Sequence, residues 1–209
     1  RALNRFSDGV LGLLRNVADV LEGTSEVEPD SWSTRVRQVE SRNREAWNAA
    51  DRAEDTLRLN PRGRLRKPVL RRYERALERH ARVWLHVRVL VRTVGLTGSP
   101  AQGLEPDGES QPLLRDLALL VDATADAIAA DVAPLRGPQA PDSPETGPMD
   151  RLDDATERLH ALLDALEGDH GLDVSTVRLI RKILVSVEGI LMDLAPRFGA
   201  TPATAALAR

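Results

Sequence analysis

A long run of apolar residues at helical spacing most constrains the fold of this chain. Between Pro68 and the glycines Gly95 and Gly98, apolar residues recur at intervals of three and four: Leu70, Tyr73, Leu77, His80 or Ala81, Trp84, Val87, Val91 and Val94. This spacing places them on one side of an α-helix, and proline is well suited to the first helical turn. We therefore predict a long amphipathic helix over 68–95, whose apolar side needs a partner.

The same periodicity recurs in five other segments, and no segment shows the alternation of a β-strand. These predicted helices cover 7–22, 30–59, 110–132 and 150–167, and a last one starts behind Asp173 or Ser175 and ends at Phe198. Aromatic residues are only 3% of the chain, which also argues against a sheet. We predict an all-α fold, a bundle of about six mostly antiparallel helices with long central helices.

We expect a single helical-bundle domain over 1–209. Within it we predict an N-terminal three-helix part (1–95), a loop (96–109), a helix (110–133), a flexible proline-rich connector (134–149), a C-terminal helix pair (150–198) and a tail (199–209). Both connections are predicted from their glycine and proline content, and the second has five prolines between Pro134 and Pro148.

Charge is distributed unevenly along the chain, although the net charge is only −3. Between Arg58 and Arg92 there are twelve basic residues and two acidic ones, whereas between Thr93 and Asp173 there are seventeen acidic residues and four arginines. This asymmetry indicates either a basic helix packed beside an acidic one or a face held against an anionic surface.

No motif for catalysis or cofactor binding is present. The absence of cysteine excludes disulfides and thiolate metal sites, and there is no P-loop, nucleophile elbow or glycine-rich dinucleotide turn. Two Glu-x-x-His units, Glu157–His160 and Glu167–His170, lie within fourteen residues instead of on two separate helices, so we do not interpret them as a di-iron site. We expect no enzyme activity, no metal and no cofactor.

The main candidate for a binding site is an arginine-rich corner between the second and third predicted helices. Its members are Arg62, Arg64, Arg66, Lys67, Arg71, Arg72 and Arg75, with Arg79 following. We expect no nucleic-acid partner, because neither a recognition helix nor interleaved aromatic residues beyond Tyr73 are present. Two interpretations stay open: contact with anionic lipid headgroups, and an internal network of ion pairs with the acidic helices.

The segment from Asp51 to Arg92 resembles the cytoplasmic helical region of actinobacterial membrane proteins in the FUSC, or aromatic acid exporter, superfamily (the fusaric-acid-resistance-like proteins). The matching motifs are Leu59-Asn60-Pro61-Arg62, the arginines from Arg64 to Arg72, and Arg88-Val89-Leu90-Val91-Arg92. The last predicted helix contains a run from Val174-Ser175 to Met192-Asp193-Leu194 that is also similar to the C-terminal helix of that family. His86-Val87 departs from the pattern, in which a more polar pair is expected.

The resemblance implies a soluble domain that follows a membrane-embedded portion of the same polypeptide, on the cytoplasmic side of the cell membrane. Its role in transport or efflux would be structural or regulatory: homo-oligomerisation, gating, or contact with anionic lipid or solute. The chain itself has no window that approaches the roughly 20 apolar residues of a membrane span, so we expect it not to cross a bilayer. The alternative is a stand-alone helical adaptor that binds a protein partner.

Overall fold

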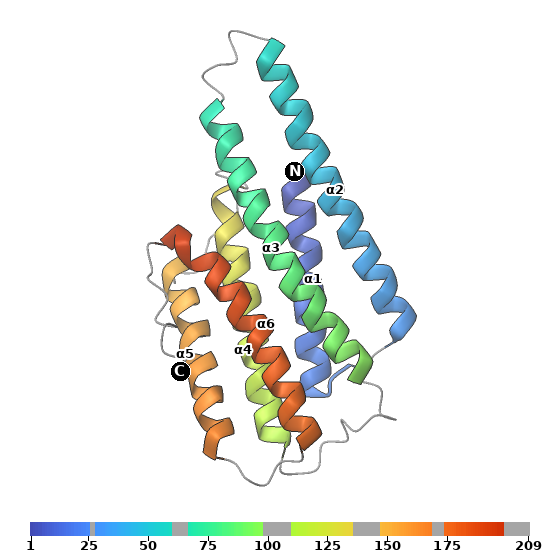
Figure 1. Cartoon of the computed structure of the whole chain (residues 1–209), viewed down its shortest axis with the longest axis vertical. Coiled ribbons are helices and arrows are strands. Elements are labelled where there is room, and N and C mark those ends of the chain that lie inside the picture. Colours follow the sequence, from blue (N-terminus) through green and yellow to red (C-terminus); the bar gives the residue numbers. More distant parts are fainter. Residues whose placement is uncertain (26–27, 60–66, 98–109, 136–146, 169–173, 199–209) are drawn as a thin grey trace.

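The computed structural model of this chain describes residues 1–25, 28–59, 67–97, 110–135, 147–168 and 174–198. All regular structure in these ranges is helical (Figure 1). The elements are α1 (Ala2–Glu22), α2 (Pro29–Leu59), α3 (Lys67–Thr97), α4 (Gln111–Val132), the short 3-10 helix η3 (Ala133–Leu135), α5 (Pro148–Gly168) and α6 (Val174–Phe198). The prediction of an all-α bundle of about six helices is confirmed.

The first helix begins earlier than we predicted. We expected a start near Ser7, but α1 starts at Ala2. Leu3 and Phe6 are almost completely buried, so the apolar side of the helix extends a further turn toward the N-terminus. The other end is as predicted: Gly23 adopts a φ of 80°, the left-handed conformation with which glycine commonly ends a helix.

Four helices surround the core, and two cover its sides. α1 packs most extensively against α4, and α3 packs most extensively against α6. α2 lies against α1 and α3, and α5 lies against α4 and α6. Successive helices run in opposite directions, so α3 and α6 are antiparallel neighbours in front of α1 and α4 (Figure 1).

The chain thus forms two three-helix halves, α1–α3 and α4–α6, with matching contacts. Within each half, all three helices pack against one another. Between the halves, each of the two strongest contacts joins corresponding helices, α1 with α4 and α3 with α6. This is the contact pattern of two subunits related by a two-fold axis.

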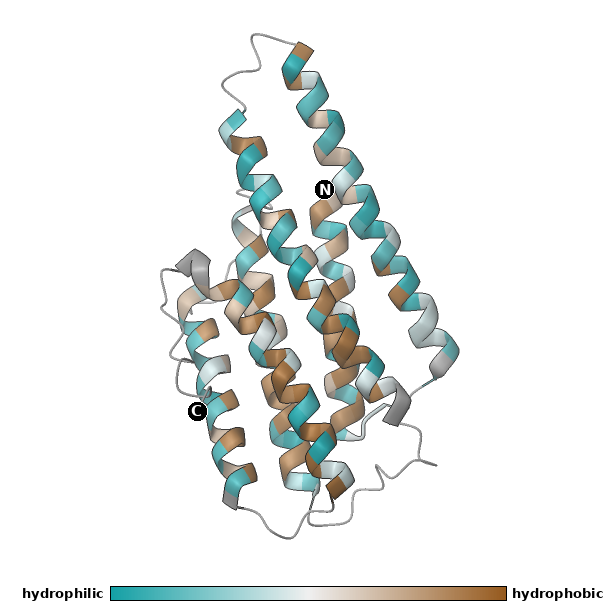
Figure 2. Cartoon of the chain, in the orientation of Figure 1, coloured by the Kyte–Doolittle hydropathy of each residue, from teal (hydrophilic) through white to brown (hydrophobic). Residues whose placement is uncertain are grey.

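The two halves differ in length. α2 and α3 have 31 residues each, whereas α5 has 21 and α6 has 25. The end of α2 and the beginning of α3 therefore project beyond the rest of the bundle (Figure 1). Apolar residues concentrate in the body of the bundle, and the projecting hairpin is mainly hydrophilic (Figure 2).

The largest fully buried side chains come mostly from the four central helices. They include Phe6, Leu13, Leu77, Leu90, Leu117, Ile128, Ile180 and Ile183. α2 contributes small residues, since Ala46 and Ala50 are buried where it approaches its neighbours. Trp32 and Trp84 are buried in the core, and Trp47 is partly buried against it.

Candidate anion-binding surface

Four members of the predicted arginine-rich corner are described by the structure, and all four are exposed at the beginning of α3. These are Lys67, Arg71, Arg72 and Arg75, which we call the hairpin cluster. The other three predicted members, Arg62, Arg64 and Arg66, lie outside the described residues. No member of the hairpin cluster forms an ion pair with another residue that the structure describes.

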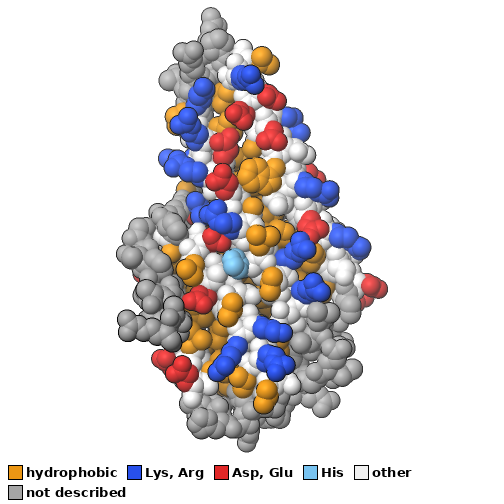
Figure 3. Space-filling view, in the orientation of Figure 1, with side chains coloured by type: hydrophobic (Ala, Val, Ile, Leu, Met, Phe, Trp, Pro, Cys, Tyr) orange, Lys and Arg blue, Asp and Glu red, His pale blue; other side chains and the backbone are white. Residues whose placement is uncertain are grey.

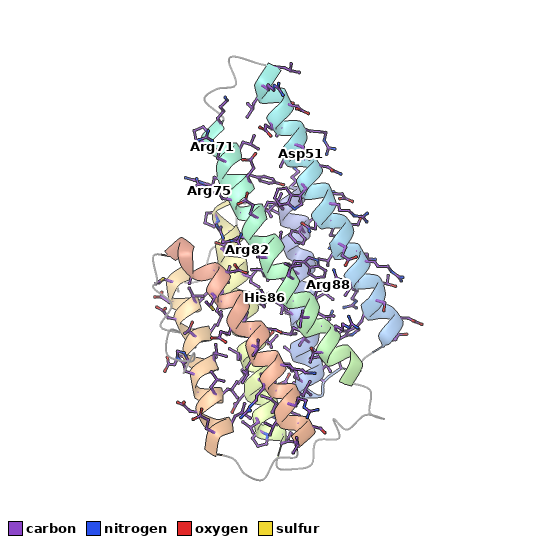
Figure 4. All side chains as sticks on the ribbon, in the orientation of Figure 1. Asp51, Arg71, Arg75, Arg82, His86 and Arg88 are labelled. Carbon is purple, nitrogen blue, oxygen red and sulfur yellow. The ribbon has the colours of Figure 1, made fainter. Side chains whose placement is uncertain are left out.

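The hairpin cluster points away from the bundle. Arg71 and Arg75 extend from the side of α3 that is turned away from α2 (Figure 4). The Nε atom of Arg75 donates a hydrogen bond to the carbonyl oxygen of Arg71 at 3.3 Å, which directs this side chain along the helix. The cluster is therefore available to an anionic partner.

Arg79 does not belong to this surface. Its guanidinium donates hydrogen bonds to both carboxylate oxygens of Asp131 on α4, at 3.2 Å and 3.1 Å. The Nε2 atom of His80 lies 3.1 Å from the same carboxylate. His80 and Asp131 are completely buried. For Arg79, the internal ion-pair interpretation therefore applies.

Other cationic side chains of α3 are also paired within the molecule. Arg82 donates to Asp193 of α6 at 2.7 Å, and His86 lies 3.6 Å from the other oxygen of that carboxylate. Arg88 pairs with Glu40 of α2 at 3.3 Å. These three side chains point toward their partner helices (Figure 4). Ion pairs thus connect α3 to α2, α4 and α6, although the partly exposed ones each contribute only up to about 1 kcal/mol.

The structure also forms a second basic surface, which we did not predict from the sequence. It lies along the outer sides of α3 and α6, and we call it the α3–α6 face. Its exposed residues are Leu85, Val89 and Arg92 from α3, and Val174, Arg178, Arg181, Lys182, Val185 and Met192 from α6. On each helix they are separated mainly by three, four or seven positions, which keeps them on one side.

The α3–α6 face is unusually apolar for a surface. Five of the eight large hydrophobic side chains that the described residues expose belong to it, including Val89 at 55% and Val185 at 66%. A groove of about 700 Å³ between the two helices is lined by both valines and by Arg178, Arg181 and Lys182. Hydrophobic and basic side chains lie next to one another on the lower half of this face (Figure 3). Exposed apolar patches of this kind mark contact surfaces.

The hairpin cluster and the α3–α6 face lie on the same side of α3. Along this side follow Arg71, Arg75, Glu78, Arg82, Leu85, Val89 and Arg92, at intervals of four, three, four, three, four and three residues. Such intervals keep side chains on one stripe of a helix. One surface therefore extends from the projecting hairpin to the far end of α3.

The opposite side of the bundle, formed by α1 and α4, carries a small excess of negative charge. Its exposed carboxylates are Asp8, Asp19, Glu22, Asp116, Asp122 and Asp126, and its exposed basic residues are Arg1, Arg5, Arg15 and Arg115. Partial burial raises the pKa of Asp122, and the negative charges of Asp19 and Asp126 raise it further, against the opposing effect of Arg15. This crowding shows that the carboxylates of α1 and α4 act on one another.

Outside these surfaces the described residues also line a pocket of about 890 Å³ between α1, α2 and α3, but they contain no candidate metal site. Glu157 and His160 lie on α5, and no group of three or more potential ligands in the described ranges is placed to hold a metal ion. The second Glu-x-x-His unit includes His170, which lies outside those ranges. None of the described helices contains an apolar stretch of the length and purity that a bilayer crossing requires.

Comparisons of the chain with protein-family models, with curated proteins and with solved structures find no match. The resemblance to the FUSC superfamily therefore stays a prediction from the sequence.

Proposed function

We propose that this chain is the cytoplasmic domain of a FUSC-like membrane transporter, and that its hairpin cluster contacts anionic lipid headgroups. The observation that carries the proposal is the exposure of Lys67, Arg71, Arg72 and Arg75 at one end of a projecting hairpin. A basic residue near an anionic membrane surface contributes about 1 kcal/mol of attraction. Four of them support reversible binding.

In this proposal the role of the domain is structural or regulatory. Attachment through the hairpin would hold the bundle beside the membrane-embedded portion of the same polypeptide, at the cytoplasmic mouth of the transport path. The alternative function, a stand-alone helical adaptor, is supported by the apolar groove between α3 and α6, which has the lining that a partner helix needs.

Co-sedimentation with lipid vesicles tests the lipid contact. Wild-type protein should bind vesicles that contain phosphatidylglycerol and not vesicles of phosphatidylcholine alone. Reversing three charges (Arg71→Glu, Arg72→Glu and Arg75→Glu) should weaken binding by about 100-fold or more, since each lost contact removes about 1 kcal/mol and each new carboxylate adds repulsion.

A matched control changes the net charge equally at exposed arginines elsewhere on α2 and α4: Arg35→Glu, Arg44→Glu and Arg115→Glu. This control should keep most of the affinity, and circular dichroism should show both variants folded. Unchanged binding of the hairpin variant, or an equal loss in the control, would rule out a lipid contact centred on the hairpin cluster.

The transporter assignment has its own test in the reading frame upstream of Arg1. Several in-frame apolar segments of about 20 residues each would support a membrane-embedded portion. A start codon next to Arg1 would favour the adaptor.

A further inference from the structure

We infer that the bundle lies flat on an anionic membrane, with the whole α3–α6 face against the lipid and the apolar side chains of that face inserted between the headgroups. The inference rests on the proposed function for its choice of lipid as the partner. It goes beyond that function because it assigns a second contact surface, of a different chemistry, and an orientation of the molecule.

The first reason is the direction of the side chains on α3. Arg71 and Arg75 of the hairpin cluster share one stripe with Leu85, Val89 and Arg92. From Arg71 to Arg92 this stripe is about 30 Å long at 1.5 Å per residue. A membrane that meets the two hairpin arginines along this stripe therefore also meets the remainder of α3 and the neighbouring α6.

The second reason is the chemistry of the face. Val89 and Val185 are exposed on either side of the groove, and Arg92, Arg178, Arg181 and Lys182 form no ion pair with any residue in the described part of the chain. Helices that lie in the plane of a membrane surface combine apolar side chains, which enter the headgroup region, with basic side chains, which reach the phosphates.

The third reason is that few carboxylates oppose the contact. Asp193 is already paired with Arg82 and lies near His86. Glu78 is exposed, but it lies between Arg75 and Arg82 on α3, and Glu74 of α3 and Glu188 of α6 are only partly exposed. The α1–α4 side, in contrast, carries six exposed carboxylates against four exposed arginines, and only one large exposed hydrophobic residue among those the structure describes, Leu119 at 52%. The net charge of that side is therefore negative, which makes it the less favourable side for an anionic membrane.

The arrangement favours a membrane over a partner protein. Protein interfaces concentrate apolar residues at their centre and place charged residues at the rim. Here the order along α6 is Val174, Arg178, Arg181, Lys182, Val185, the partly exposed Glu188 and Met192, so charged side chains, mostly basic, interrupt the apolar ones. This interspersed pattern is typical of membrane-surface helices.

Single-cysteine labelling tests the inference cleanly, because the chain contains no cysteine. Val185→Cys and Val89→Cys place an environment-sensitive fluorophore on the α3–α6 face, and Leu119→Cys places it at a comparably exposed site on the α1–α4 side. Val69→Cys reports on the hairpin end, where Val69 is 70% exposed. Each labelled protein is mixed with vesicles that contain phosphatidylglycerol.

We expect a blue shift and a several-fold rise in fluorescence at positions 185 and 89, and no change at 119. A response at position 69 alone would overturn the flat orientation and leave the hairpin contact intact. An absence of vesicle binding by any variant would overturn both proposals. A response at position 185 to an acidic amphipathic peptide of Leu and Glu, but not to vesicles, would overturn the inference in favour of the adaptor.

A second variant separates apolar insertion from charge attraction. Val89→Ser combined with Val185→Ser should lower the vesicle affinity about tenfold and make the remaining binding disappear at high salt, because exposed charge attraction is screened. Leu119→Ser is the matched control and should bind as the wild type does. Equal affinities of the three proteins at high salt would overturn the insertion of the two valines.

Discussion

The two long faces of the bundle are built from equivalent antiparallel helix pairs, yet their surfaces differ in charge and in exposed apolar area. The α1–α4 side exposes six carboxylates, four arginines and one large hydrophobic residue within the described ranges, whereas the α3–α6 face exposes arginines, a lysine and most of the exposed apolar side chains. Both pairs bury their inner sides in the same core. The core explains why the inner sides of both pairs are apolar, but it does not explain the difference between their outer sides. That difference indicates that the two faces contact different surroundings outside the molecule.

The comparison also separates two uses of arginine on one helix. Arg79, Arg82 and Arg88 bind carboxylates of three neighbouring helices, whereas Arg71 and Arg75 extend outward. A local excess of positive charge in the sequence therefore has two components. One is paired within the molecule, and the other is available at its surface.

The largest effect on the free energy of unfolding is expected at the contact of α3 with α4, which joins the two faces. Asp131→Ala leaves the cations Arg79 and, when protonated, His80 without their carboxylate partner in the interior. We expect a loss of about 3–5 kcal/mol in the free energy of unfolding, measured by urea denaturation. Asp126→Ala, an exposed site on the same helix, should change stability by about 0.5 kcal/mol or less. Similar values for the two variants would contradict a stabilising role of the buried cluster.

Glycine-to-alanine substitutions are expected to have an intermediate effect on folding stability, destabilising on the α3–α6 face and stabilising on the α1–α4 side. A Cβ atom on Gly189 of α6 would overlap the imidazole ring of His86, so Gly189→Ala should destabilise the fold by about 1–3 kcal/mol. A Cβ atom on Gly12 of α1 would enter open space, with no neighbouring atom within 4 Å, so Gly12→Ala should stabilise by about 0.5–1 kcal/mol.

Thermal unfolding of both glycine variants, with the double variant Gly189→Ala and His86→Ala, completes this comparison. Removing the imidazole should recover part of the stability that Gly189→Ala loses. A stabilising Gly189→Ala would show that His86 rotates away from α6 at no cost, and the close contact of α3 with α6 would then carry little energy.

The smallest effect on stability is expected at Asp122, on the α1–α4 side. The pKa of Asp122 is raised in the folded chain, so the folded state holds this proton more tightly and stability falls as the pH rises from about 3.8 through the folded pKa. Asp122→Asn removes that loss. We expect its melting temperature at pH 7 to exceed that of the wild type by on the order of 1 °C, with no gain at pH 3. A gain of the same size at both values would assign the effect to packing instead of charge.

The sequence was sufficient to predict the helices because each carries its own apolar periodicity. Leu77, Trp84 and Val91 of α3 are buried as their spacing indicates. α1 ends at Glu22 as predicted, whereas α3 extends from Lys67 to Thr97, slightly beyond the predicted range of 68–95. The early start of α1 was missed because Leu3 and Phe6 precede the interruption at Ser7 and Asp8. The exposed members of the arginine-rich corner were also found from the sequence, as an excess of local charge.

The α3–α6 face could not be predicted in this way. Val89 and Val185 are far apart in the sequence, and they line one groove only because α3 pairs with α6. Periodicity specifies which side of a helix is buried, but it does not specify which two helices lie side by side. For the same reason the sequence did not distinguish Arg79, which meets Asp131, from the exposed Arg75. The sequence nevertheless contained one indication of an exposed apolar face, since Val185 and Met192 lie off the buried stripe of α6.

The matching contacts of the two three-helix halves have a consequence for assembly. The two three-helix halves pack against each other as the subunits of a two-fold dimer do, although they belong to one polypeptide. The connection between α3 and α4 keeps the halves close together, so each meets the other at a high effective concentration. Cutting that connection would turn an intramolecular equilibrium into a bimolecular one, and stability would then depend on protein concentration. Two uncut copies could also exchange halves, since each α1–α3 unit presents the surface that any α4–α6 unit recognises.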